Sequence, residues 1–273
     1  MHKFALLALV VLSLPAAAAE TAWQEVAPDV RLRLIASESR DAMGRTLVGL
    51  EVDMPADHKT YWAVPGETGI PTTLDLAGSV GVDGFEMLWP FPVTEVVAGY
   101  LDRVYHGPTV LPFNLVATDD SALVEVAVVM GICSDICVPA MANFTLQLDF
   151  SQTDTAAGLR LAQAAALAPI RWDGAEPALG APHFDAATEE LVVPVLSPEV
   201  DTTSIIADAG LTGPLFGAPQ KSPQTGLVRI PLLGGGKDGV AAGAAVTLTF
   251  QTARGPFSLV QELVSAGSTP ADP

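Results

Sequence analysis

Glycine and proline interrupt this chain along its whole length and leave little room for long helices. Its 273 residues include 24 glycines and 22 prolines, and both residue types break helices and mark turns. Between these interruptions, apolar residues recur at every second position. The clearest run covers residues 143–150, whose apolar members are Phe144, Leu146, Leu148 and Phe150. Such alternation is typical of a strand with one face on a core and the other in water, so we expect an all-β protein.

One segment departs from the two-residue rhythm. Residues 153–168 are rich in alanine and leucine and stop at Pro169, which predicts a helix with a threonine or aspartate start and a proline stop. Strand-like stretches continue after it, at residues 191–196, 227–233 and 245–251. The pattern therefore predicts two antiparallel β-sandwiches joined by a short helix, because each β-region has the size of a small sandwich.

The expected domain boundaries follow from these elements. We expect a first β-domain at residues 20–150, a helical linker at 151–170, a second β-domain at 171–265 and a flexible polar tail at 266–273.

The first 19 residues have the pattern of a cleaved export signal. A basic start precedes an apolar run from Phe4 to Leu14, and alanines follow Pro15 up to Ala19. A membrane anchor is the alternative, but it needs a longer apolar run, of about 18 residues or more. We therefore expect cleavage after Ala19. Outside the cytosol, a pair of cysteines can persist as a disulfide.

Charge and composition exclude several classes of function. The chain has 31 acidic and 13 basic residues, a net charge of −18, so a nucleic acid would be repelled. The hydrophobic content of 49% is too high for a disordered chain. No apolar run is long enough to insert in a bilayer, and no phosphate-binding loop or metal-ligand spacing is present. We therefore expect no cofactor and no metal site.

The two cysteines, Cys133 and Cys137, are the candidate site of chemistry. They separate a strand candidate at residues 123–130 from the alternating run at 143–150, so we expect them across a tight hairpin, where a disulfide can form. Closing so short a loop stabilises a fold by only about 2 kcal/mol, against about 4.7 kcal/mol for a hundred-residue loop. Tight cross-strand disulfides also tend to be strained and reducible. These features favour a reversible redox pair. A structural hairpin disulfide remains the alternative, because the spacing is not the C-x-x-C of thioredoxin-like proteins.

Several blocks of sequence resemble a known family. They are residues 131–140 (GICSDICVPA), 61–71 (YWAVPGETGIP), 89–92 (WPFP), and 99–100 (GY) with Val104. In residues and order they resemble the periplasmic N-terminal domain of DsbD- and ScsB-type thiol:disulfide interchange proteins, and the ScsB-like branch most. The resemblance runs from about Trp23 to Phe150 and is loose beyond it.

The resemblance implies an immunoglobulin-like sandwich with Cys133 and Cys137 as the catalytic redox pair, and Cys137 as the cysteine that forms the mixed disulfide. It implies a thiol–disulfide oxidoreductase of the protein-disulfide reductase type, in the periplasm of a Gram-negative bacterium. Its partners would be a membrane-embedded thiol carrier or thioredoxin-like protein on one side and oxidised periplasmic proteins on the other. Family members continue into a membrane domain and a thioredoxin-like domain. This sequence has neither, so we expect its electrons to come from another chain.

Two other functions stay open at this point. The chain could be a non-catalytic binding module with a structural disulfide, or a copper-tolerance accessory protein whose reduced thiols act as soft ligands. Aromatic side chains could shield the sulfurs or dock a partner, although core packing is the simpler expectation for them; they are Trp62, Trp89, Phe91 and Tyr100. A copper site could draw on His58, His106 and His183 with Met54, Met87 or Met130, but no ligand spacing supports it.

Overall fold

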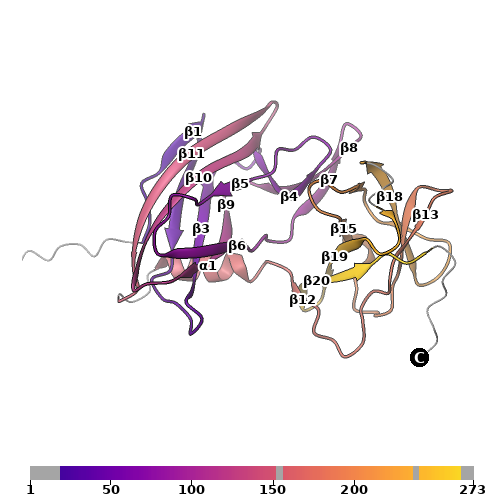
Figure 1. Cartoon of the computed structure of the whole chain (residues 1–273). Coiled ribbons are helices and arrows are strands. Elements are labelled where there is room, and N and C mark those ends of the chain that lie inside the picture. Colours follow the sequence, from indigo (N-terminus) through magenta and orange to yellow (C-terminus); the bar gives the residue numbers. More distant parts are fainter. Residues whose placement is uncertain (1–18, 152–155, 236–239, 266–273) are drawn as a thin grey trace, which may run out of the picture.

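A computed structural model describes residues 19–151, 156–235 and 240–265, and it confirms the all-β class. The strands form two lobes, the first ending in helix α1 (Ala156–Ala165) and the second beginning at strand β12 (Ile170–Arg171), as Figure 1 shows. Residues 1–18 of the predicted signal peptide, the first residues of the predicted helix and the polar tail lie outside the described residues.

The first lobe is a sandwich of two sheets. One sheet has the order β1 (Gln24–Ala27), β2 (Val30–Ala36), β3 (Arg45–Asp53), β9 (Thr109–Ala117) and β6 (Val82–Met87). The other has the order β11 (Cys137–Asp149), β10 (Ser121–Cys133), β4 (Lys59–Gly66), β8 (Tyr100–His106) and β7 (Val93–Val97), with β5 (Thr73–Asp75) paired to β10. All of these pairings are antiparallel.

The core of this sandwich comes from the predicted alternation. On β11 the inward residues Phe144, Leu146 and Leu148 are buried, while their polar neighbours are exposed. The facing sheet contributes the same pattern from β2 and β3, and these side chains join one cluster. Burial of this continuous apolar surface is the main force that holds the two sheets together.

Helix α1 packs on the first sandwich. Leu161 and Ala157 are buried against Ile35 of β2. A Cβ atom at Gly49 of β3 would lie 2.5 Å from the Leu161 side chain, so a glycine allows the helix to approach the sheet this closely. Arg160 adds an ion pair with Glu20, at 3.3 Å.

The second lobe is built on one nine-stranded sheet, eight of whose strands form a single hydrogen-bonded path. Its order is β12, β20 (Gly255–Glu262), β19 (Ala245–Thr252), β15 (Ile206–Asp208), β16 (Leu215–Phe216), β18 (Leu227–Gly234), β14 (Glu190–Pro194) and β13 (His183–Asp185), with β17 (Gln220–Lys221) paired to β18. A short 3-10 helix, η1 (Thr202–Ser204), precedes β15.

This path curls around a core of its own. Leu191 and Val193 of β14 belong to the same buried cluster as Phe250 of β19 and Phe257 of β20. A parallel bridge joins His183 of β13, at one end of the path, to Val264, which lies just after β20. The strands predicted at residues 191–196, 227–233 and 245–251 correspond to β14, β18 and β19.

A buried arginine joins the two lobes. Arg103 of β8 is only 1% exposed, and its Nη2 donates a hydrogen bond of 2.8 Å to the backbone carbonyl of Phe216 in β16. Burial lowers the pKa of Arg103 to about 10, and the nearby charge of Asp208 acts in the opposite direction. Ile206 of β15 also packs against the core of the first lobe. The second lobe is therefore held against β8, the strand next to edge strand β7 in its sheet.

Candidate redox site

The two cysteines form a disulfide at the end of the hairpin of β10 and β11. Cys133 is the last residue of β10, Cys137 is the first residue of β11, and the two are direct partners in the strand register. Their Cα atoms lie 4.1 Å apart. This confirms the predicted placement of both cysteines across a tight hairpin, with Ser134, Asp135 and Ile136 as the loop.

The two sulfurs differ in their exposure. Cys133 is fully buried, in a small cluster with Tyr61 and Val104. Cys137 is exposed, and beside it Ile136 is 74% exposed. A reacting partner can therefore reach Cys137 from solvent, while Cys133 is enclosed.

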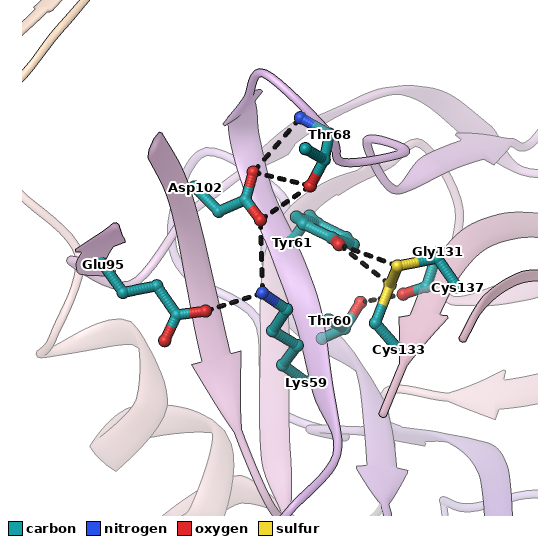
Figure 2. The surroundings of a disulfide bond; sticks show 9 residues. All are labelled: Lys59, Thr60, Tyr61, Thr68, Glu95, Asp102, Gly131, Cys133 and Cys137. Atoms are coloured by element: carbon teal, nitrogen blue, oxygen red, sulfur yellow. Dashed lines mark hydrogen bonds and ion pairs between the residues drawn. A yellow bond between two sulfur atoms is a disulfide. The ribbon is translucent and has the colours of Figure 1, made fainter. Parts of the chain in front are cut away.

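A tyrosine hydroxyl faces the disulfide from β4. The Tyr61 oxygen lies 2.8 Å from Cys133 Sγ and 3.4 Å from Cys137 Sγ, and Figure 2 shows it pointing at the two sulfurs. Burial raises the pKa of Tyr61, with Thr68 and Lys59 acting in the opposite direction. Sequence reasoning placed Tyr61 in a family motif but gave it no role. The strand alternation could have suggested one, because the adjacent Trp62 faces the core and Tyr61 therefore faces away from it.

A charged group lies on the same face of the sheet, beyond Tyr61. Lys59 Nζ contacts Glu95 at 2.6 Å and Asp102 at 3.2 Å, and the Thr68 hydroxyl donates to Asp102 at 2.8 Å. Burial disfavours the charge of Lys59, but the two carboxylates outweigh it and raise its pKa. Burial likewise opposes the charge of Glu95, yet Lys59 and His106 lower its pKa. These side chains come from β4, β7, β8 and the loop after β4 (Figure 2).

This charged group predicts a specific loss of stability in acid. The lowered pKa of Glu95 stabilises the folded state above the pKa of the unfolded chain, and the gain disappears as pH falls through the folded value. Glu95→Gln should therefore lower the free energy of unfolding by about 1 kcal/mol near pH 6, and the difference should vanish near about pH 3. Denaturant unfolding at both pH values measures it. The exposed carboxylate of Glu86 provides the control, and an equal change in Glu86→Gln would contradict this assignment.

Two contacts hold the hairpin end beside β4. The Thr60 hydroxyl donates a hydrogen bond of 2.8 Å to the carbonyl of Gly131, and Cys133 is in register with Lys59. A Cβ atom at Gly131 would lie 3.0 Å from the ring of Tyr61, so a glycine leaves the space that the ring occupies.

Three of the four aromatic candidates pack in or against the core. Trp62 is buried in the core, and Trp89 and Phe91 pack partly buried against it. Tyr100 is 53% exposed. Core packing therefore accounts for three of the four aromatic residues that could have shielded the disulfide.

The histidines and methionines considered for copper are dispersed. His58 contacts Asp57, and His106 contacts Glu95, while Met54 and Met130 are core residues. Across the described ranges, no group of three or more histidine, cysteine, aspartate or glutamate side chains is placed to hold a metal ion.

A family comparison covers the whole of this site. Residues 33–149 match the family described as the N-terminal part of the thiol:disulfide interchange protein DsbD. Residues 33–149 are therefore similar to a DsbD N-terminal domain. Every residue of the site, from Lys59 to Cys137, lies inside this domain.

A solved structure extends the likeness of fold beyond the DsbD-type domain. The crystal structure of the N-terminal periplasmic domain of ScsB from Proteus mirabilis is 21% identical and has a TM-score of 0.68. The similarity covers 91% of this chain and 99% of that chain, so it includes the second lobe. No curated protein matches the chain. Among the described residues, no helix has both the length and the apolar character needed to cross a membrane.

Proposed function

We propose that this chain is a periplasmic thiol–disulfide exchange protein in which Cys133 and Cys137 alternate between a disulfide and a dithiol. It would pass electrons between a membrane thiol carrier or thioredoxin-like protein and oxidised periplasmic proteins. The observation that carries the proposal is the disulfide at the hairpin end of a DsbD-type domain, with one sulfur exposed and the other against Tyr61.

The exchange uses the two sulfurs in order. A thiolate of the reduced partner attacks Cys137 Sγ, the disulfide breaks, and the electron pair stays on Cys133 Sγ. The new bond joins Cys137 to the partner as a mixed disulfide. The partner's second thiolate then attacks its own bonded sulfur and releases Cys137. Two electrons enter the chain, two protons bind its thiolates, and the partner leaves as a disulfide.

The position of the bond supports a redox role over a structural one. Strands β10 and β11 have 13 residues each and pair along their full length. The hairpin is therefore held by its backbone ladder, and the disulfide closes only a loop of about five residues, worth about 2 kcal/mol. A bond that contributes so little to stability can be opened and closed without loss of the fold.

Export is part of the proposal. The signal-like N-terminus supports it, and the similar domain of ScsB is a periplasmic domain. An oxidising compartment is where a disulfide of this kind persists and meets oxidised partners.

The reduction potential tests the function directly. The oxidised chain, equilibrated in glutathione and dithiothreitol redox buffers, should reach half reduction above about −300 mV. Acid quenching, alkylation and intact mass measure the reduced fraction, and the Cys133→Ser/Cys137→Ser double variant gives the background. A potential below about −300 mV would make the bond a structural one, resistant to the glutathione pool.

A further inference from the structure

The buried sulfur of the disulfide has a hydroxyl as its close neighbour. Tyr61 Oη is 2.8 Å from Cys133 Sγ and 3.4 Å from Cys137 Sγ, so it is nearer to the sulfur that solvent does not reach. The distance to Cys133 is within the hydrogen-bonding range for a hydroxyl and sulfur, and a sulfur accepts far more strongly when it carries a negative charge.

Reduction places a negative charge at this buried position. When a thiolate attacks the exposed Cys137 Sγ, the disulfide breaks and Cys133 Sγ receives the electron pair. A thiolate without water around it is strongly disfavoured, because its charge is desolvated. A hydrogen-bond donor at the sulfur offsets that cost, as donors do for charge that develops in other buried sites.

We propose that Tyr61 is a catalytic residue of the exchange reaction, whose hydroxyl donates a hydrogen bond to the departing Cys133 thiolate. The inference rests on the proposed exchange function and adds a named group to it. Tyr61 keeps its own proton in this step. The bond that forms joins Cys137 to the partner, the bond that breaks is Cys133–Cys137, and the thiolate takes its proton later from solvent.

The surroundings of Tyr61 suit a donor. Burial raises the pKa of its phenol, so the hydroxyl remains protonated over the range in which thiols titrate. Its ring is also held between two glycines. A Cβ atom at Gly69 would lie 2.3 Å from one edge of the ring, and one at Gly131 would lie 3.0 Å from another. Both glycines leave room for a ring placed against the disulfide, and neighbouring Thr60 is bonded to Gly131.

The same geometry gives the reaction a direction. A donor that sits closer to Cys133 stabilises the charge there more than on Cys137, since electrostatic stabilisation falls with distance. Attack on Cys137 with Cys133 as the departing sulfur is therefore favoured over the reverse. Exposure of Cys137 favours the same order.

Tyr61→Phe tests the inference, because it removes the hydroxyl and keeps the ring. Oxidised wild-type chain is first reduced by dithiothreitol, and the rate is followed by alkylation and intact mass. Tyr61→Phe should react about tenfold more slowly, the expected effect of one hydrogen bond to a charged group. In a Cys137→Ser background, it should also raise the pH midpoint of Cys133 ionisation, followed by thiolate absorbance, by about one unit.

Tyr105→Phe is the matched control. Tyr105 is also a buried tyrosine of this domain, but its hydroxyl donates a hydrogen bond of 2.6 Å to the carbonyl of Pro90 and not to a sulfur. Tyr105→Phe should reduce at the wild-type rate. If Tyr61→Phe fails to fold, a fluorinated tyrosine at position 61 replaces it. Fluorine strengthens the hydroxyl as a donor, so this variant should react faster and lower the Cys133 midpoint.

The outcomes distinguish a failure of the Tyr61 role from a failure of the proposed exchange function. A wild-type chain that dithiothreitol does not reduce contradicts the exchange function before any variant is made. A wild-type chain that reacts, with Tyr61→Phe equal to it in rate and in Cys133 midpoint, overturns the role of Tyr61 and leaves the exchange function standing.

Discussion

Cys133→Ser is expected to turn the chain into a trap that keeps its partner as a stable mixed disulfide. The remaining thiol, on Cys137, is exposed and can react. The serine at position 133 cannot attack the mixed disulfide and resolve it, because a hydroxyl is not a nucleophile toward sulfur at neutral pH. With oxidised glutathione as the probe, intact mass should show one glutathione adduct that persists until a reductant is added.

Cys137→Ser is the matched variant, and it should behave differently. Its remaining thiol, on Cys133, is fully buried behind the hairpin end and against Tyr61. Burial raises the pKa of a thiol and restricts access, so adduct formation should be slower by about a hundredfold. Adducts that form at equal rates on the two variants would show that the sulfurs are not distinguished by their burial.

Arg103→Glu is expected to separate the two lobes. In the native chain the Arg103 guanidinium is buried and donates to the Phe216 carbonyl across the interface. A glutamate there would place a buried carboxylate opposite a carbonyl oxygen and near the charge of Asp208. An uncompensated buried charge costs about 3–5 kcal/mol. Small-angle scattering should therefore show a larger radius of gyration, and chemical unfolding should show a less stable protein.

Arg103→Met separates the loss of charge from the loss of volume. Two of the guanidinium nitrogens, Nε and Nη1, have no hydrogen-bond partner within the described part of the chain. Removing a charge that is so poorly paired releases its desolvation cost. Arg103→Met should therefore stay compact, with a stability within about 2 kcal/mol of wild type. If Arg103→Glu also remained compact, a buried negative charge at position 103 would not be enough to open the interface between the lobes.

Local sequence patterns predicted the strands and the hairpin of the cysteines well. The alternation over residues 143–150 indicated β11 and its inward side chains because a strand repeats every two residues. The cysteines lay between two such runs, which left only a hairpin turn to separate them. Both features depend only on residues that are neighbours in the sequence, so the sequence alone can predict them.

The remainder of the site depends on contacts between distant parts of the sequence. Lys59, Glu95 and Asp102 come from three strands, and their ion pairs exist only because β7, β8 and β4 are neighbours in one sheet. Tyr61 reaches the disulfide across 72 positions of sequence. No local pattern records the order of strands, so these partners could not be assigned in advance.

The interface between the lobes was hidden for a related reason. Arginine is rarely buried, so its type suggests a solvated position on a strand. The adjacent residues Asp102 and Arg103 point to opposite faces of β8, one into the charged group near Tyr61 and the other into the second lobe. Only the assembled structure shows that one strand carries both.

The unequal burial of the two cysteines limits the chain to one covalently bound partner at a time. In the proposed exchange, electron donor and electron acceptor must both bond to Cys137, because the sulfur of Cys133 is enclosed. One sulfur holds one partner, so the donor has to depart before the acceptor can arrive. The two half-reactions then alternate in a ping-pong order, and an excess of either partner occupies the position that the other requires.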